Sequence, residues 1–413
     1  PYKPGDKVTL TLKVRNDGTD TLYRLRAVTE SDDPVFDDRE FLFGRLAPGA
    51  ERTWSMETKV PEHAVQRLDP VKFVFAAEGD PAIAPVEFRA ALADIGHPIF
   101  AYHVSVVDDL SGNGDGRIQR GESVRLVVDI ENRGEVAALD SVSSIRNKSG
   151  EQVYIRTGRA KLAEIPPGGR AVAVFELEVK SAYEDDSFFL EFSVTDFETR
   201  DFVAERLSIP VAPAATAPPA AAQGVVQPRA APLTLLQVAD DQASAIGTID
   251  EPAKLSRTHS LPGWVRVALP DGHAGWVAEE DVRAATGAVA ESVPFTPVPG
   301  NVQPRFVRLD APLSVSTETA VLSGVVEDDS PILDLQVFVG DVKVFYENYR
   351  DANTNRVEWT VELELGGGMN EVRIFVRETA EVTTWRGLVI RRDNPDGSTM
   401  PTEDRSLEDL LEE

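Results

Sequence analysis

The sequence predicts an all-β protein of tandem β-sandwiches joined by Pro-rich linkers, and three observations predict it. Apolar and polar residues alternate with a period of two in many short segments, which is typical of strands with one buried face. One set of strands and turns occurs twice in the chain, which indicates two similar domains. Two segments rich in proline divide the 413 residues into separate folded parts.

The internal repeat is clearest in one strand of each copy. Residues 8–18 (VTLTLKVRNDG) match residues 124–134 (VRLVVDIENRG) without a gap, and an Asn-x-Gly ends each match. Each copy continues with a Pro-Gly turn, a further strand and an aromatic strand: residues 46–49, 53–60 and 71–75 in the first, and 165–168, 171–179 and 188–192 in the second. We therefore expect sandwiches over residues 1–95 and 96–211. The first lacks the opening strand and loop of the second.

That opening part of the second copy is a strand at residues 101–107 and a loop with EF-hand calcium-loop spacing. With Ser111 as position 1, Asn113 falls at position 3, Asp115 at 5, Gly116 at 6 and Glu122 at 12. Short oxygen-bearing side chains on alternate residues converge where glycine lets the chain curl, and calcium takes about six to eight oxygen ligands. The predicted ligands are Asp109, Ser111, Asn113, Asp115, the backbone carbonyl of Arg117, and Glu122.

Two questions about this loop stay open at the level of sequence. Ser111 stands where an Asp is usual, so the missing carboxylate would come from Asp109 or Asp108. The alternative for the whole loop is a solvated turn, because Asn-Gly and Asp-Gly are common turn formers. Strands rather than helices flank the loop, so a bound Ca²⁺ would clamp two strands and have a structural role.

The middle of the chain is expected to hold a linker and a small domain. Ala- and Pro-rich residues 212–232 predict an extended, semi-rigid spacer. Residues 233–285 are expected to form a compact barrel, in which Trp264 and Trp276 each follow a glycine. Both tryptophans are candidates for stacking against a ligand, and the alternative is that both fill the core.

Two histidines of the small domain have no partner at metal-ligand spacing. His259 and His273 are therefore expected to face solvent in turns or hairpins. A second Pro-rich linker is expected at residues 286–304.

The last domain, residues 305–392, is expected to be another sandwich. A strand at 320–328 precedes a hairpin with a two-residue turn, Gly340-Asp341. A further pair of strands, 357–365 and 370–378, is expected around three glycines. The acidic tail, 393–413, has a weak capping box from Ser406 to Asp409 that predicts a marginal helix at best.

Charge and composition limit the partners. A net charge of −27 argues against nucleic acids and anionic membrane surfaces, and it suits divalent cations. The absence of cysteine fits an extracytoplasmic bacterial protein that relies on packing and ions. No apolar run reaches about 18 residues, so no transmembrane segment is expected. Because the sequence starts at Pro1, we expect it to be a piece of a longer protein.

Catalytic motifs are not found. The five histidines do not lie in a Gly-x-Ser-x-Gly or His-Glu-x-x-His setting, and no Ser-x-x-Lys occurs. Carboxylates are abundant, but a glycosidase pair would need a cleft that sandwiches of ~100 residues seldom build. We expect this chain not to be an enzyme.

Three resemblances add to this interpretation. The repeated pair resembles CARDB-type immunoglobulin-like modules of bacterial surface and secreted proteins, through Pro-Gly-Asp at 4–6, Arg-Gly-Glu at 120–122, the alternating strand and Asn-x-Gly. Residues 263–277 resemble the Gly-Trp, Asp-Gly, Gly-Trp-Val hairpin of bacterial SH3-like domains, which often bind cell-wall or proline-rich peptides. The last domain looks like other bacterial immunoglobulin-like folds.

The order of these domains resembles the C-terminal region of delta-proteobacterial carboxyl-terminal processing (tail-specific) serine peptidases. In that family a PDZ domain and a peptidase domain come first, and no catalytic residue carries over to this chain. The resemblance implies a periplasmic or extracellular accessory region that positions a peptidase on a protein substrate or on the cell wall. The alternative is a free-standing adhesive or wall-binding surface protein. Either way, the expected partner is a protein or a peptidoglycan peptide.

Overall fold

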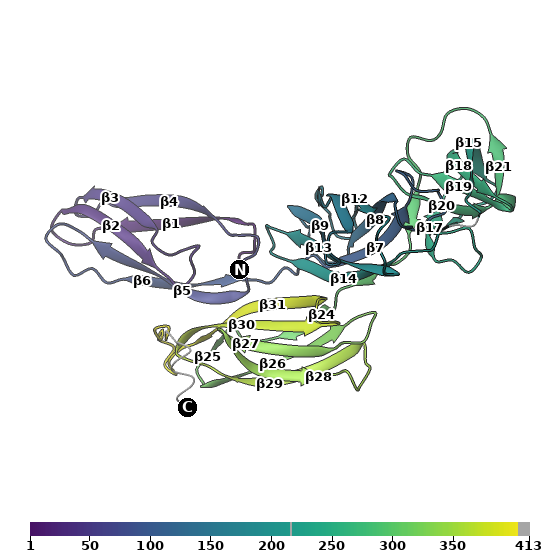
Figure 1. Ribbon diagram of the computed structural model, residues 1–413. Coiled ribbons are helices and arrows are strands. Elements are labelled where there is room, and N and C mark those ends of the chain that lie inside the picture. Colours follow the sequence, from purple (N-terminus) through teal and green to yellow (C-terminus); the bar gives the residue numbers. More distant parts are fainter. Residues whose placement is uncertain (215–216, 404–413) are drawn as a thin grey trace. The chain divides into compact units, whose positions relative to one another are not determined.

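The computed structural model describes residues 1–214 and 217–403, and strands make up nearly all of their regular structure (Figure 1). The helical part of the described chain is one short 3-10 turn, Glu279–Asp281. The all-β prediction is therefore confirmed, and the helix expected at residue 406 lies outside the described residues. The chain divides into two compact units. One contains Pro1–Ile95, Pro304–Glu378 and the segment from Thr384; the other contains Gly96–Gln303 and Thr379–Thr383.

The first sandwich packs a two-stranded sheet against a four-stranded sheet. The small sheet pairs β1 (Lys7–Arg15) with β4 (Glu51–Lys59). The larger sheet has the order β3-β2-β5-β6, with bounds Glu40–Leu46, Leu22–Glu30, Arg67–Ala76 and Val86–Leu92. The core between the two sheets is aromatic and aliphatic, and it includes Leu10, Phe41, Phe43 and Phe73.

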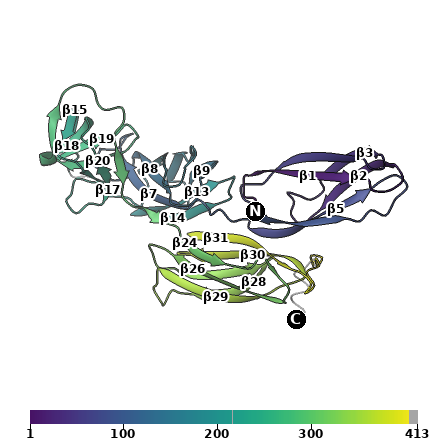
Figure 2. The same cartoon turned by 180° about the vertical axis from the view of Figure 1, so that it is seen from behind.

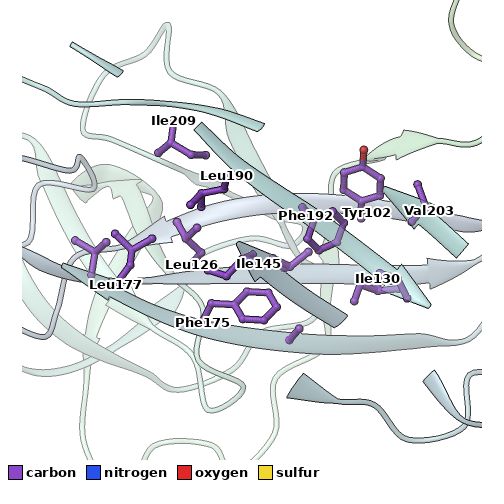
Figure 3. Close-up of a cluster of buried hydrophobic side chains, with 14 of the residues drawn as sticks. Tyr102, Leu126, Ile130, Ile145, Phe175, Leu177, Leu190, Phe192, Val203 and Ile209 are labelled. Carbon is purple, nitrogen blue, oxygen red and sulfur yellow. The ribbon is translucent and has the colours of Figure 1, made fainter. Parts of the chain in front are cut away.

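The second sandwich repeats this plan with more strands. One sheet has the order β10-β12-β8-β7-β23, with bounds Val153–Thr157, Arg170–Val179, Ser123–Asn132, Phe100–Val107 and Asn301–Val302. The other has the order β11-β9-β13-β14, with bounds Arg159–Lys161, Ser141–Asn147, Ser187–Asp196 and Phe202–Pro210. Figure 3 shows the core between them, where Leu126, Phe175 and Phe192 point inward. The alternation in residues 124–130 thus places one face of β8 in a dry core.

The repeat extends to single hydrogen bonds. Asn16 donates its side-chain N–H to the carbonyls of Asp20 and Leu46, at 2.8 and 2.9 Å. Asn132 does the same to Val136 and Ile165, at the same two distances. The Asn-x-Gly motif therefore ties the end of one strand to the Pro-Gly turn in both sandwiches. Its conservation between the copies follows from the buried carbonyls that the amide satisfies.

The small domain is one antiparallel sheet of eight strands. Its order is β21-β15-β18-β19-β20-β16-β17-β22, with bounds Val282–Ala285, Ala220–Pro228, Leu255–Leu261, Trp264–Ala268, Ala274–Ala278, Leu233–Leu236, Ala245–Ile249 and Phe295–Pro297. Among the described residues, the end strands β21 and β22 are not neighbours in this order, so hydrogen bonds do not close the sheet into the expected barrel.

Both predicted linkers are partly wrong. Within 212–232, β15 pairs with β18 and β21 and buries Val226, so the small domain begins about a dozen residues before the expected 233. Within 286–304, β22 pairs with β17 of the small domain, and β23 pairs with β7 of the second sandwich. β22 is an edge strand, and the prolines near β15 lie just before it and at its last residue. Proline is compatible with a sheet at such positions, and the composition therefore concealed both strands.

The last sandwich packs a sheet β24-β26-β29 against a sheet β25-β31-β30-β27-β28 (Figures 1 and 2). In the second of these sheets β25 runs parallel to β31. Their bounds are Arg305–Asp310, Thr319–Glu327, Arg356–Glu364, Ser314–Val315, Thr383–Arg392, Gly368–Arg377, Asp334–Val339 and Val342–Asn348. The hairpin of β27 and β28 is confirmed, with Val339 opposite Val342. The expected pairing of β29 with β30 is wrong, because the glycine turn carries the chain from one sheet to the other.

In the part of the chain that the structure describes, no helix is long and apolar enough to cross a membrane.

Candidate cation loop and domain interface

The candidate site is the loop between β7 and β8, two antiparallel neighbours in the second sandwich. Gly114, Gly116 and Gly121 have φ values of 83°, 86° and 90°, a region that favours glycine. The first two also lie against the small domain. A Cβ on Gly114 would be 2.7 Å from the His259 ring, and one on Gly116 would be 1.9 Å from the carbonyl oxygen of Gln237. The loop is therefore fitted to a neighbouring domain as well as curled on itself.

Three carboxylates gather at the base of this loop. Asp108 and Glu122 are buried, and Asp115 is close enough to act on both of them electrostatically. Burial raises the pKa of Glu122 to about 7, and the charges of Asp108 and Asp115 contribute to the rise. Burial likewise raises the pKa of Asp108. A local excess of buried negative charge is the electrostatic condition that a bound cation relieves.

The predicted ligands are only partly brought together. Asn113 accepts the Asp115 N–H at 2.9 Å, and Asp115 accepts the Arg117 N–H at 2.8 Å, so both side chains belong to the curled part of the loop. Glu122 accepts the Gln119 N–H at 2.9 Å. Ser111 lies at the mouth, where its Oγ accepts the Ser123 N–H at 2.8 Å.

Asp109 is a correction to the predicted ligand set. Its carboxylate pairs with the guanidinium of Arg125 on the outer side of the loop, with one contact of 2.9 Å. Asp108 is the residue that faces the loop interior, where its Oδ2 accepts the Gly116 N–H at 3.2 Å. Successive residues leaving a strand point to opposite sides, so only one of the adjacent pair can face inward.

Gln119 is a residue that the sequence interpretation missed. Its buried side chain donates to Asp115 Oδ2 at 2.7 Å and accepts from the Asn113 amide at 2.6 Å, so it links the two side chains. Position 9 of an EF-hand loop often contributes to calcium through water, and that position is Gln119 here. In the described residues, no three His, Cys, Asp or Glu side chains stand at metal-ligand geometry. The side chains around the curl carry oxygen atoms, the donor type that calcium takes, and calcium binding at this loop stays a prediction.

Asp108 also connects the loop to the small domain. Its Oδ1 lies 3.0 Å from the guanidinium of Arg266 on β19, and both side chains are almost completely buried. Gln237 completes the contact, because its amide donates to the carbonyls of Val106 and Gly116, at 2.7 Å each. The loop thus forms part of the contact between the second sandwich and the small domain.

A second polar contact crosses the same interface. His273 lies with one ring nitrogen 2.9 Å from Asp129 on β8 and the other 2.9 Å from Asp271. Burial lowers the pKa of His273, but the two carboxylates outweigh this and raise it to about 9. Val107, Val127 and Ala274 pack beside this contact. The prediction that His273 faces solvent is therefore wrong. Its ring is buried where the small domain contacts the second sandwich, and the Asp129 carboxylate compensates for the water that the ring loses there.

The two tryptophans have different environments. Trp276 on β20 is 0% exposed and lies opposite Arg266 in the strand register, so it is on the face that meets the second sandwich. A ligand cannot stack on Trp276 in this structure, which corrects half of that prediction. Trp264, at the start of β19, is partly exposed, and its role as a ligand contact remains a prediction.

The fold and the site together define a class of protein: a chain of tandem β-sandwiches with an acidic loop at the joint, which is the contact between the second sandwich and the small domain. No family model matches the chain, and no curated protein matches it. Among solved structures, the chain is similar to a tetra-tandem repeat in the extending region of a large adhesion protein. That match has 13% identity and a TM-score of 0.19, and it covers 90% of this chain and 92% of that one.

Two further matches to solved structures have similarly low identities and TM-scores. The match to Escherichia coli alpha-2-macroglobulin activated by porcine elastase has 10% identity and a TM-score of 0.17, and it covers 95% of this chain and 43% of that one. The match to Sidekick-1 immunoglobulin domains 1–5 has 9% identity and a TM-score of 0.17, over 95% and 96% of the two chains. TM-scores of this size show no shared arrangement of the whole chain, so the fold class rests on the strand pairing itself.

Proposed function

We propose that this chain is a non-catalytic binding region that works outside the cytoplasm, and that calcium in the loop 108–122 stiffens its central joint. The observation that carries the proposal is the position of Asp108. This residue belongs to the acidic loop and also holds Arg266 of the small domain, so the charge state of the loop and the docking of the domain depend on one carboxylate. An ion that stabilises the loop therefore also stabilises the joint.

The ligands would be Asp108, Asn113, Asp115, Glu122 and the carbonyl of Arg117, with Gln119 contributing directly or through water. Calcium would supply the positive charge that the buried carboxylates need, and it would keep Glu122 ionised at neutral pH. Asp109 and Ser111 would close the outer rim of the loop through Arg125 and Ser123. The ion has a structural role in this proposal.

The binding partner would be a peptide held by the small domain. Its resemblance to bacterial SH3-like domains favours a cell-wall peptide or a proline-rich protein segment, and Trp264 is the partly exposed aromatic residue that could contact it. The resemblance of the domain order to tail-specific peptidases supports an accessory role beside a peptidase. In that role the joint would hold the peptide-binding domain at a fixed position relative to the sandwiches.

The proposal is tested by the distance across the joint. The chain contains no cysteine, so Glu151→Cys and Asp241→Cys, both exposed, introduce two labelling sites, one on each domain. Pulsed electron spin resonance should give a narrow distance distribution in calcium and a broader one in chelator. Equal widths in both conditions would rule out calcium as the element that stiffens the joint.

Two loop variants serve as a matched pair for this experiment. Asp115→Ala removes a proposed ligand and should give the broad distribution even in calcium. Asp109→Ala alters the neighbouring carboxylate that pairs with Arg125, and it should keep the calcium response. A calcium response that survives Asp115→Ala would place the ion elsewhere.

A further inference from the structure

The larger sheet of the first sandwich has an open hollow of about 460 Å³ on its outer face, over β3, β2 and the end of β5 (Figure 1). Along β3 its lining alternates as Glu40, Leu42 and Gly44, whereas Phe41 and Phe43 between them belong to the core. The hollow is thus separated from the core by the sheet itself. Its volume lies in the range of about 300–1,000 Å³ that is usual for ligand sites.

One cation of the hollow lies between two small or apolar residues. In the strand register Arg26 of β2 has Leu42 of β3 on one side and Ala76 of β5 on the other. Leu42 is 48% exposed. In the second sandwich the repeat places Ser193 where the first has Ala76, and Ser193 faces Ser144 with the two hydroxyls 2.9 Å apart. The repeated fold therefore does not require a guanidinium at this position.

A second cation of the hollow, Arg24, has a strained backbone. Its φ is 52°, in the left-handed region that favours glycine. The register of β2 against β3 shifts by one residue between Leu22 and Leu25, so Arg24 belongs to a bulge. Among the described residues of β9, the corresponding strand, none has a positive φ. Strain of this kind costs on the order of 1–3 kcal/mol and is frequent at binding sites, where bulges re-aim a side chain.

The two guanidiniums are only loosely held by carboxylates. Arg24 lies 3.8 Å from Glu78, and Arg26 lies 3.1 Å from Glu40. All four side chains are exposed, and exposed pairs contribute about 0–1 kcal/mol. Each guanidinium also has more N–H donors than one carboxylate uses. A further carboxylate can therefore bind to both arginines at little cost.

Two more arginines lie beside the hollow. A Cβ on Gly44 would be 3.8 Å from Nη1 of Arg52 on β4. Arg45 follows Gly44, and its guanidinium lies 5.9 Å from the ring centre of the exposed Tyr23. In the part of the chain that the structure describes, neither arginine forms an ion pair.

Positive charge thus exceeds negative charge at this place in an acidic chain. Four guanidiniums, those of Arg24, Arg26, Arg45 and Arg52, stand against the carboxylates of two glutamates. The net charge of −27 is spread over the whole chain, and salt screens exposed charges beyond about 8–10 Å. The hollow is therefore complementary to a negatively charged group that approaches closely.

We propose that the hollow formed by Arg24, Arg26, Leu42, Gly44 and Ala76 binds an acidic peptide segment of a partner protein. A Glu or Asp carboxylate of the segment accepts hydrogen bonds from the guanidiniums of Arg24 and Arg26. A neighbouring apolar side chain of the segment covers Leu42 and Ala76. Both features of the ligand follow from the row of Leu42, Arg26 and Ala76 across the sheet.

The probe is the capped peptide acetyl-Glu-Leu-Glu-Leu-Glu-amide, titrated into the full chain and followed by calorimetry. We expect saturable binding that weakens about tenfold when Gln replaces each Glu, a loss that corresponds to one charge-assisted hydrogen bond. Binding should also weaken when Ser replaces each Leu, and when salt rises from about 0.05 to about 0.5 M. Equal binding by either substituted peptide, or no saturable binding of the first, would overturn the proposal.

A matched pair of variants locates the binding. Arg26→Gln should weaken the peptide about tenfold. Arg308→Gln, on β24 of the last sandwich, should leave binding unchanged. The Arg308 side chain is 51% exposed against 55% for Arg26, and each pairs with a carboxylate. Equal affinities of the two variants would place the peptide outside the hollow and overturn the proposal.

Arg24→Gly separates binding from folding. Glycine adopts a φ of this kind without strain, so this variant should bind the peptide more weakly while its melting temperature does not fall. A lower melting temperature with unchanged affinity would give Arg24 a purely structural role. If the chain alone forms a dimer that Arg26→Gln dissociates, a second copy is the occupant. Either result overturns the proposal.

Discussion

The guanidinium of Arg266 lies 3.0 Å from Oδ1 of Asp108, and these two residues come from different domains. Burial raises the pKa of Asp108 and lowers the pKa of Arg266, so each charge depends on its partner for the solvation it has lost. Removing only one partner should therefore be costly. Arg266→Met should lower the free energy of unfolding by about 3–5 kcal/mol, measured by denaturant titration in chelator.

The control for this prediction is a pair of other variants. Arg266→Met combined with Asp108→Leu should recover most of the loss, because no buried charge is then left alone. Arg125→Met, which affects the outer pair with Asp109, should cost only about 0–1 kcal/mol. A loss from Arg266→Met no larger than that from Arg125→Met would show that the buried pair does not hold the joint.

The stability of the joint should depend on pH because of His273. Its titratable neighbours are Asp271 on its own turn, and Asp129 and His103 across the interface. Its folded-state pKa is about 9, against about 6.5 for an unfolded histidine. A raised pKa means that the ion pair contributes its full stability below about pH 6.5 and loses it as the pH rises through about 9. The free energy of unfolding should fall across this range, by an amount on the order of 2–3 kcal/mol.

The measurement is a series of denaturant titrations from pH 6 to pH 9.5. His273→Asn should flatten the profile, because it removes the group whose pKa differs between the folded and unfolded chain. If the His273→Asn chain keeps the full slope, other groups cause the pH dependence.

Substitution of each tryptophan in turn should separate peptide binding from the stability of the fold. Trp264→Ala should abolish binding of a cell-wall or proline-rich peptide, followed by fluorescence titration, and leave the thermal transition in place. Trp276→Ala should instead destabilise the chain by about 3–5 kcal/mol, because it removes a completely buried large side chain. Unfolding by Trp264→Ala, or undiminished binding, would remove Trp264 from the ligand site.

The sequence predicted local features well because they depend on neighbouring residues. Alternation placed β1 and β8 within about two residues of their ends, and glycine spacing located the curl of the loop. The Gly340-Asp341 turn fixed the register of β27 and β28 for the same reason. In each case the deciding interaction lies within a few residues along the chain.

The errors arose where the deciding partner is distant in sequence. His273 is buried beside Asp129, which comes from another domain. The strand β15 has a composition typical of a linker, and it is ordered by its pairing with β18 and β21. Period and composition contain no information on these pairings.

The thermal stability of the full chain in calcium and in chelator tests the central claim, that loop 108–122 binds calcium at the joint. Extracellular calcium modules bind at about 10⁻⁴–10⁻³ M, so millimolar calcium should stabilise the folded state by roughly 0.5–1.5 kcal/mol. Calorimetry should then show the transition of the unit Gly96–Gln303 moving up by a few degrees, at about 2–4 °C per kcal/mol. Asp115→Ala should remove the shift and Asp109→Ala should keep it. The same melting temperature in calcium and in chelator would contradict the claim and leave the loop as a turn between two strands.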